Sequence, residues 1–187
     1  MLRQGSHSTD RSRRRLLSWS LAAAGAVLLP GSRLAMATAM PGRRLQFYNT
    51  HNGESISAVY WEGGRYLPDG LAEIDYALRD FRTGEVRVID PQLLDLVHRL
   101  RVVMACDRPV HVISGYRSPE TNAMLARRSK GVAKNSYHVK GMAIDLRLPE
   151  RHLKDVRAAA LALARGGVGY YPKSDFVHVD TGPVRAW

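Results

Sequence analysis

Two short apolar segments in the last third of the chain each carry a side chain that can bind a metal ion. Asp145 lies in the sequence Ala-Ile-Asp-Leu, and His178 lies in the sequence Phe-Val-His-Val-Asp. Side chains alternate between the two faces of a β-strand, so the apolar neighbours face a core while the polar residue faces the other way. The pattern predicts strands over 143–148 and 176–180, each with one polar face.

The rest of the chain alternates between strand-like and helix-like periodicity. Asp-Pro at position 90 and Ser-Pro at position 118 are typical helix starts, because the first residue caps the helix and proline suits its first turn. Residues 130–140 show no periodicity and are expected to form a loop. This order of elements favours an α+β domain with an antiparallel sheet at its centre. The further predicted strands cover 45–49, 55–61, 109–114 and 168–171, and the predicted helices cover 68–82, 90–106, 118–128 and 149–164.

The net charge of +11 is unevenly distributed along the 187 residues. The first 37 residues contain six arginines and one acid, which leaves a charge of +6 for residues 38–187. No run of basic residues alternates with aromatic residues there, so nucleic-acid binding is not favoured. A hydrophobic content of 45% argues against a disordered chain, and the length suits one domain.

Residues 1–37 have the three-part layout of an export signal. A basic start is followed by the apolar run 16–29, by a Pro-Gly break and by Ala-Met-Ala at 35–37, where a signal peptidase would cut after Ala37. The run is shorter than the roughly 20 residues that a membrane-spanning helix needs. Ser-Arg-Arg-Arg-Leu-Leu at 12–17 resembles the twin-arginine export signature. A general-secretion signal and an uncleaved anchor remain alternatives.

A third candidate ligand, His138, lies in the sequence Ser-Tyr-His-Val-Lys-Gly. Together with Asp145 and His178 it supplies two imidazoles and one carboxylate, a donor set found in catalytic zinc sites that leave a position open for water. The spacing alone does not distinguish a metal site from histidines that only make hydrogen bonds on strands.

The segment 136–145 matches the pattern Ser-x-His-x-x-Gly-x-Ala-x-Asp. This pattern resembles the signature of the zinc peptidases related to D-Ala-D-Ala carboxypeptidases, lysostaphin and the hedgehog signalling domain. The segment Ser-Gly-Tyr-Arg-Ser at 114–118 resembles a second motif of that superfamily, and the arrangement over 44–187 is similar to exported murein endopeptidases of the endopeptidase K type. The resemblance implies the superfamily's fold and a Zn²⁺ ion held by His138, Asp145 and His178.

The resemblance also implies roles for other residues. Arg117 takes the place of an arginine that holds a substrate carboxylate or stabilises the anionic transition state. For the general base, Asp175 stands three residues before the third ligand, where some members carry an acid, and Asp180 is the competing candidate or a partner that orients an imidazole. Further candidate contacts to substrate are Ser136 and Tyr116.

The expected activity is zinc-dependent hydrolysis of peptide cross-bridges in peptidoglycan, at bonds between meso-diaminopimelate residues or between D-Ala and diaminopimelate. Carboxypeptidase action on D-Ala-D-Ala ends and a non-catalytic peptidoglycan-binding module are the alternatives. The expected location is the periplasm, reached by the twin-arginine pathway. The expected partners are cross-bridge peptides, without nucleic acid and without a stable membrane anchor once the signal is removed.

Overall fold

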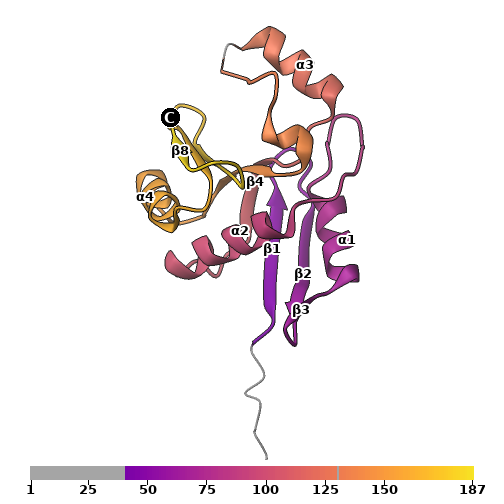
Figure 1. Cartoon of the computed structure of the whole chain (residues 1–187), viewed down its shortest axis with the longest axis vertical. Helices are drawn as coiled ribbons and strands as arrows, with labels where there is room; N and C mark the ends of the chain where they lie inside the picture. Colours follow the sequence, from indigo (N-terminus) through magenta and orange to yellow (C-terminus); the bar gives the residue numbers. More distant parts are fainter. Residues whose placement is uncertain (1–40, 130) are drawn as a thin grey trace, which may run out of the picture. The chain divides into compact units, whose positions relative to one another are not determined.

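The polar face predicted from the alternating segments belongs to an eight-stranded sheet in the order β3-β2-β1-β4-β5-β7-β6-β8. The computed structural model describes residues 41–129 and 131–187, which supply all of these strands (Figure 1). The export signal predicted over 1–37 lies outside the described residues. The strands are β1 (Arg43–Asn49), β2 (Ser55–Glu62), β3 (Arg65–Tyr66), β4 (Val110–Ser114), β5 (Ala143–Arg147), β6 (Gly167–Tyr171), β7 (Phe176–Asp180) and β8 (Arg185–Ala186).

The pairing of these strands is antiparallel except between β1 and β4 and between β6 and β8, which are parallel. Strand β5 lies between β4 and β7, and its register places Asp145 opposite His178. Both residues therefore point to the same face of the sheet, at neighbouring positions. The α+β class with an antiparallel centre, predicted from the order of elements, is confirmed.

The opposite face of the sheet carries the hydrophobic core. Ile144, Leu146, Val177 and Val179 alternate with the polar residues and are fully buried. Helices α2 (Pro91–Val103) and α4 (Leu153–Leu163) contact each other and the sheet, and α1 (Pro68–Ala77) packs on β2. Helix α3 (Pro119–Arg128) lies apart from α2 and α4, at the top of Figure 1.

Helix starts follow the sequence signals closely. Asp90 caps α2 by accepting a hydrogen bond of 2.9 Å from the backbone N–H of Gln92, and Ser118 caps α3 by accepting one of 3.1 Å from that of Thr121. Proline follows the cap in both helices, as predicted. No helix among the described residues is long and apolar enough to span a membrane.

The helices predicted over 68–82, 90–106 and 149–164 are all shorter in the structure, and the second of them ends at Val103. The helix predicted over 68–82 ends at Ala77, because the carbonyl of Leu78 accepts a hydrogen bond of 2.8 Å from the N–H of Tyr116. The helix predicted over 149–164 starts only at Leu153. Before it the chain turns at Glu150, which has a φ of +61°. The differences in the first and third of these helices arise from tertiary contacts or turn geometry that override the helical periodicity.

Three short elements escaped prediction. Strands β3 and β8 have two residues each, too few to show a period. The segment 130–140, predicted as a loop, contains the 3₁₀ helix η1 (Tyr137–Lys140). The prediction of a loop is therefore wrong at its functional end, because one turn of helix is set by its capping residues rather than by hydrophobic spacing.

Gly70 provides a test of how α1 is seated on the sheet. A Cβ atom there would lie 1.9 Å from the carbonyl oxygen of Val59 in β2. Gly70→Ala is therefore expected to lower the free energy of unfolding by about 2 kcal/mol through overpacking, although alanine is the better helix former. Urea unfolding measures the change.

The control is Ala72→Gly at an exposed position of the same helix, which is expected to cost about 1 kcal/mol by helix propensity alone. Stabilisation by Gly70→Ala would show that α1 is not held against β2 at this distance.

Candidate metal centre

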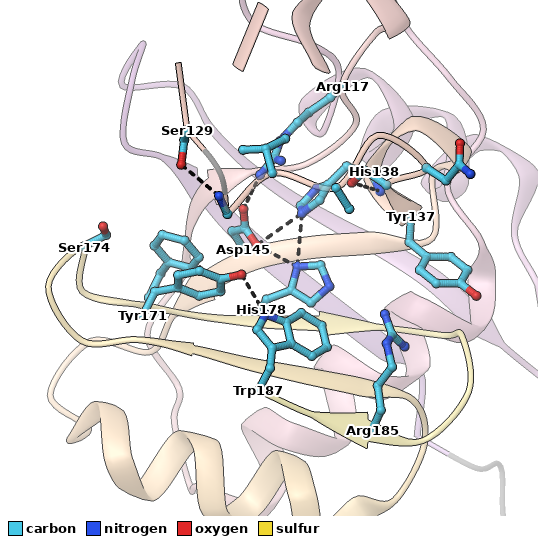
Figure 2. A pocket seen from close by; sticks show the side chains of 16 residues that line it. Arg117, Ser129, Tyr137, His138, Asp145, Tyr171, Ser174, His178, Arg185 and Trp187 are labelled. Atoms are coloured by element: carbon cyan, nitrogen blue, oxygen red, sulfur yellow. Dashed lines mark hydrogen bonds and ion pairs between the residues drawn. The ribbon is translucent and has the colours of Figure 1, made fainter. Parts of the chain in front are cut away.

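The three candidate ligands meet on the polar face of the sheet. His138 Nε2 lies 3.2 Å from Asp145 Oδ1 and 3.2 Å from His178 Nδ1, and His178 Nδ1 lies 2.9 Å from Asp145 Oδ1. All three residues are buried, and each contributes one ligand atom to a group within 4.8 Å. They come from η1, β5 and β7, and Figure 2 shows their side chains directed at one point.

The motif residues around His138 explain how η1 holds this ligand. The hydroxyl of Ser136 accepts a hydrogen bond of 3.3 Å from the N–H of His138 and caps the 3₁₀ helix. Gly141 ends the helix with a φ of +71°, and a Cβ there would lie 2.4 Å from the carbonyl oxygen of Val88. The serine and the glycine thus fix where the imidazole lies.

The protonation of His138 follows from its second nitrogen. Nδ1 lies 2.7 Å from the carbonyl oxygen of Gly115, which can only accept, so Nδ1 carries the proton. Burial lowers the pKa of His138 and keeps the imidazole neutral, despite the attraction of Asp145. The lone pair of Nε2 therefore faces the other two ligands.

His178 is oriented in the same way by Asp180. Its Nε2 lies 2.9 Å from Asp180 Oδ2, so Nε2 donates and the lone pair of Nδ1 faces the cluster. Burial alone would lower the pKa of His178, but hydrogen bonds to Asp145 and Asp180 outweigh burial and raise it. The field around Nδ1 thus attracts positive charge, whether a proton or a metal ion.

Asp145 is held by its second oxygen. Arg117 donates from Nη2 to Asp145 Oδ2 and from Nε to the hydroxyl of Ser114, at 2.8 Å. Burial would raise the pKa of Asp145, but His138, His178 and Arg117 outweigh it and hold the pKa far below the ordinary range. The carboxylate is ionised, with Oδ1 directed at the two imidazoles.

The donor set fits a divalent metal ion. Two imidazole lone pairs and one carboxylate oxygen converge within hydrogen-bond distance of one another, and the outer nitrogen of each ring already has an acceptor. Such a cluster of acceptors is stable only around a cation, and two His with one Asp suit zinc. A cavity of about 510 Å³ opens beside it, and Asp145 is the only carboxylate among the described residues that line it.

The two candidate general bases, Asp180 and Asp175, lie in different surroundings. Asp180 is fully buried and accepts hydrogen bonds from the N–H groups of Gly167 and Gly182, from Arg185 and from His178. Burial opposes its ionisation, but these donors outweigh burial and hold its pKa well below the usual value. Asp180 therefore orients His178 and does not open into the cavity.

Asp175 is not brought to the cavity. Its carboxylate pairs with Nη1 of Arg147 at 2.5 Å, its side chain is 61% exposed, and its φ of +53° places it in the turn before β7. The lining of the cavity includes its neighbours Ser174 and Phe176 but not Asp175 itself. The spacing from His178 favoured Asp175, but the turn directs its carboxylate to Arg147.

Of the two further residues proposed to contact substrate, Ser136 lines the cavity and Tyr116 does not. Ser136 lines the cavity, although its hydroxyl is used as a helix cap. Tyr116 is 2% exposed, and its hydroxyl donates to Glu85 Oε1 at 2.5 Å, outside the cavity. Arg117 does line the cavity, beside Asp145.

Sequence reasoning did not single out Tyr171, Arg185 or Trp187, which also line the cavity. The ring of Trp187 lies 5.2 Å from the imidazole of His178, between ring centres. The pattern Gly-x-Gly at 167–169 was the available signal, because missing side chains on one strand face leave room for large ones from elsewhere.

Comparisons with known proteins identify the family of the chain. A family model described as peptidoglycan L,D-endopeptidase MepK matches residues 37–187. The peptidoglycan L,D-endopeptidase MepK of Escherichia coli K12 is 45% identical over 178 residues, covering 95% of this chain and 98% of that protein. A Haemophilus influenzae protein named "Probable peptidoglycan L,D-endopeptidase MepK" is 44% identical over 179 residues, covering 95% of this chain and 96% of that protein.

One solved structure shows a weaker likeness. The crystal structure of the L-Ala D-Glu endopeptidase ChiX of Serratia marcescens has a TM-score of 0.34 and 16% identity, and covers 51% of this chain and 68% of that one. This likeness is too weak to support a conclusion. The match to the family model and the two close relatives are decisive instead: the chain belongs to the MepK family of peptidoglycan L,D-endopeptidases.

Proposed function

We propose that this chain is an exported zinc endopeptidase that hydrolyses peptide cross-bridges of peptidoglycan, at the bond between two meso-diaminopimelate residues. The observation that carries the proposal is the convergence of His138 Nε2, Asp145 Oδ1 and His178 Nδ1 beside a cavity, in a chain whose relatives are named for peptidoglycan hydrolysis. Both relatives are named for an L,D bond, which favours the diaminopimelate bridge over a D-Ala bond between two D centres.

In the proposed mechanism, His138, Asp145 and His178 would hold a metal ion, which would supply the positive charge that activates water and polarises the scissile carbonyl. The protein's own part is orientation. Gly115 and Asp180 fix the two imidazoles through their outer nitrogens, and Arg117 fixes the carboxylate through Oδ2. This outer layer of hydrogen bonds keeps three lone pairs aimed at one point before substrate arrives.

Arg117 has a second task in this proposal. Its Nε and Nη2 are bound to Ser114 and Asp145, and Nη1 donates to no acceptor within the described residues. Because Arg117 also lines the cavity, Nη1 is available to a substrate carboxylate or carbonyl oxygen. The guanidinium thus connects substrate to a metal ligand.

Asp180 acts in the proposed mechanism by orienting His178, not by taking a proton from water. It is fully buried and its oxygens already receive several donors. Asp175 would have to break its pair with Arg147 and turn toward the cavity to act as a base. Its exposure and its position in the turn do not support that role.

Export through the twin-arginine pathway completes the proposal. The Arg-Arg pair and short apolar run within residues 1–37 support it, and so does the need to reach the cell wall, on which the named relatives act. Transport of a folded protein would allow the metal to be bound before export. A charge of +6 over residues 38–187 suits an anionic cell wall.

The first prediction from the proposed function concerns which peptide bond is cleaved. The zinc-loaded protein is expected to convert muropeptide dimers linked through two diaminopimelate residues into monomers, with much slower cleavage of dimers linked through D-Ala. Mass spectrometry of the digest distinguishes the two.

Free D-Ala released from monomeric pentapeptide would indicate a carboxypeptidase instead. Both dimers surviving with metal bound would indicate a binding module and would overturn the proposed function.

The second prediction concerns the ligands. Asp145→Ala is expected to weaken zinc binding by ten-fold or more, because one ligand is lost and Arg117 is left without its partner. Zinc content after dialysis against a competing chelator measures this. Asp107→Ala, at an exposed position away from the cavity, is the control. An unchanged zinc content in Asp145→Ala would refute the assignment.

The third prediction separates the two acids. Asp180→Asn is expected to lower zinc affinity by about 10- to 100-fold, because the amide orients His178 Nε2 less well than a carboxylate. Asp175→Asn is expected to leave both zinc affinity and turnover within about three-fold of the wild type. A large loss of turnover in Asp175→Asn with zinc retained would restore Asp175 as the base.

A further inference from the structure

Tyr171 is the aromatic residue of the cavity whose polar group is best placed to act on substrate. Its side chain runs back along β6 over Gly169, where a Cβ would lie 2.8 Å from Tyr171 Cε2 and 2.8 Å from Trp187 Nε1. Gly169 is paired with His178 across the two strands. Directly opposed residues have Cβ atoms about 5 Å apart, so the rings of Tyr171 and Trp187 lie beside the metal ligand.

The orientation of the Tyr171 hydroxyl follows from its partner. Trp187 Nε1 lies 2.7 Å from the Tyr171 oxygen, and an indole N–H can only donate. The tyrosine oxygen is therefore the acceptor, and its own proton must point elsewhere. It donates to no acceptor within residues 41–129 and 131–187, and Figure 2 shows the hydroxyl directed toward the space between Asp145 and Trp187.

The ring itself is held firmly. Phe176 stacks on Tyr171 with ring centres 4.5 Å apart and an angle of 20° between the planes. Two backbone hydrogen bonds to β6 hold Trp187 in place. Its N–H donates to the carbonyl of Val168, and its carbonyl accepts from the N–H of Tyr170. A donor placed in advance at a fixed position is the arrangement that stabilises a developing charge most effectively.

Several other donors near the ligands are already hydrogen-bonded. Arg185 binds Asp180 and the carbonyl of Pro183, Trp187 binds Tyr171, and two of the three nitrogens of Arg117 bind Ser114 and Asp145. Tyr171 thus offers a neutral O–H donor on the His178 side of the centre. Arg117 Nη1 offers the second free donor, on the Asp145 side.

We propose that the Tyr171 hydroxyl, oriented by the indole N–H of Trp187, donates a hydrogen bond to the oxyanion that forms when the cross-bridge amide is attacked. The inference rests on the proposed function and adds to it a catalytic residue and a positioning residue. Tyr171 touches the reacting oxygen, while Trp187 acts only through Tyr171.

The test compares Tyr171→Phe with Tyr170→Phe in the zinc-loaded full-length protein. Tyr170 is the adjacent tyrosine on the other face of β6, where Arg157 lies over its ring at 5.2 Å. Tyr171→Phe is expected to lower kcat about 100-fold on cross-linked muropeptide dimers, with KM and zinc content within two- to three-fold of the wild type. Tyr170→Phe is expected to behave as the wild type.

A second readout does not depend on turnover. A phosphinic dipeptide carries a tetrahedral anion that resembles the transition state, and its Kd is expected to rise by about the same factor in Tyr171→Phe as kcat/KM falls. Calorimetry gives this value. If the wild type binds the phosphinic dipeptide but cleaves no muropeptide, the proposed function fails, while the difference in Kd still decides the role of Tyr171.

The part of Trp187 is tested by a double-mutant cycle. Trp187→Phe keeps a ring beside His178 but lacks the N–H, so it is expected to lower kcat by about ten-fold. It should have no further effect when Tyr171 is already Phe. Additive losses would overturn the role of Trp187 as a positioning residue. Wild-type turnover and phosphinic dipeptide affinity in Tyr171→Phe, or loss of its zinc, would overturn the proposal for Tyr171.

Discussion

A single buried carboxylate connects the parts of this molecule that bear on its chemistry. Asp145 on β5 meets His178 from β7, His138 from η1 and Arg117 from the segment that precedes α3. Strand pairing can align only the first of these contacts. The other two contacts involve chain segments that have no ladder of hydrogen bonds to the sheet, so side-chain bonds to Asp145 add to a few backbone bonds, such as that from Arg117 N–H to the His138 carbonyl, on that side of the cavity. The buried charge of Asp145 requires polar partners. Both of its carboxylate oxygens therefore have them, Oδ1 beside the two imidazoles and Oδ2 as the acceptor of a hydrogen bond from Arg117.

Much of the fold could be predicted because its strands are half-buried and alternate cleanly. Period two alone placed Asp145 and His178 on the polar faces of their strands, and the caps at Asp90 and Ser118 marked two helix starts. The same reasoning failed where local pattern and tertiary contact disagree. The helix expected to continue to residue 82 stops at Ala77 because Tyr116 binds the Leu78 carbonyl, a contact between residues 38 positions apart in the sequence.

The sequence pointed to the three residues that converge and, through the resemblance, to Arg117 beside Asp145 and Asp180 beside His178. His138 was a candidate by its residue type alone, since one turn of 3₁₀ helix has no hydrophobic period, and the family signature then supported it as a ligand. Asp175 was favoured by its distance in sequence from His178, but its own positive φ changes where the acid points. The contact between Tyr171 and Trp187 depends on the parallel pairing of β8 with β6. A strand of two residues is too short for its sequence to predict which strand it pairs with.

The short strand β8 has a practical consequence for anyone who handles this protein. Its position beside β6 brings Trp187 to the rim of the cavity, close to His178. A purification tag or reporter joined after Trp187 would begin beside the cavity and could obstruct the entry of peptidoglycan. It would also pull on the strand that holds the indole in place. Strand β1 supplies none of the residues that line this cavity, so a tag joined ahead of β1 does not pull on β8.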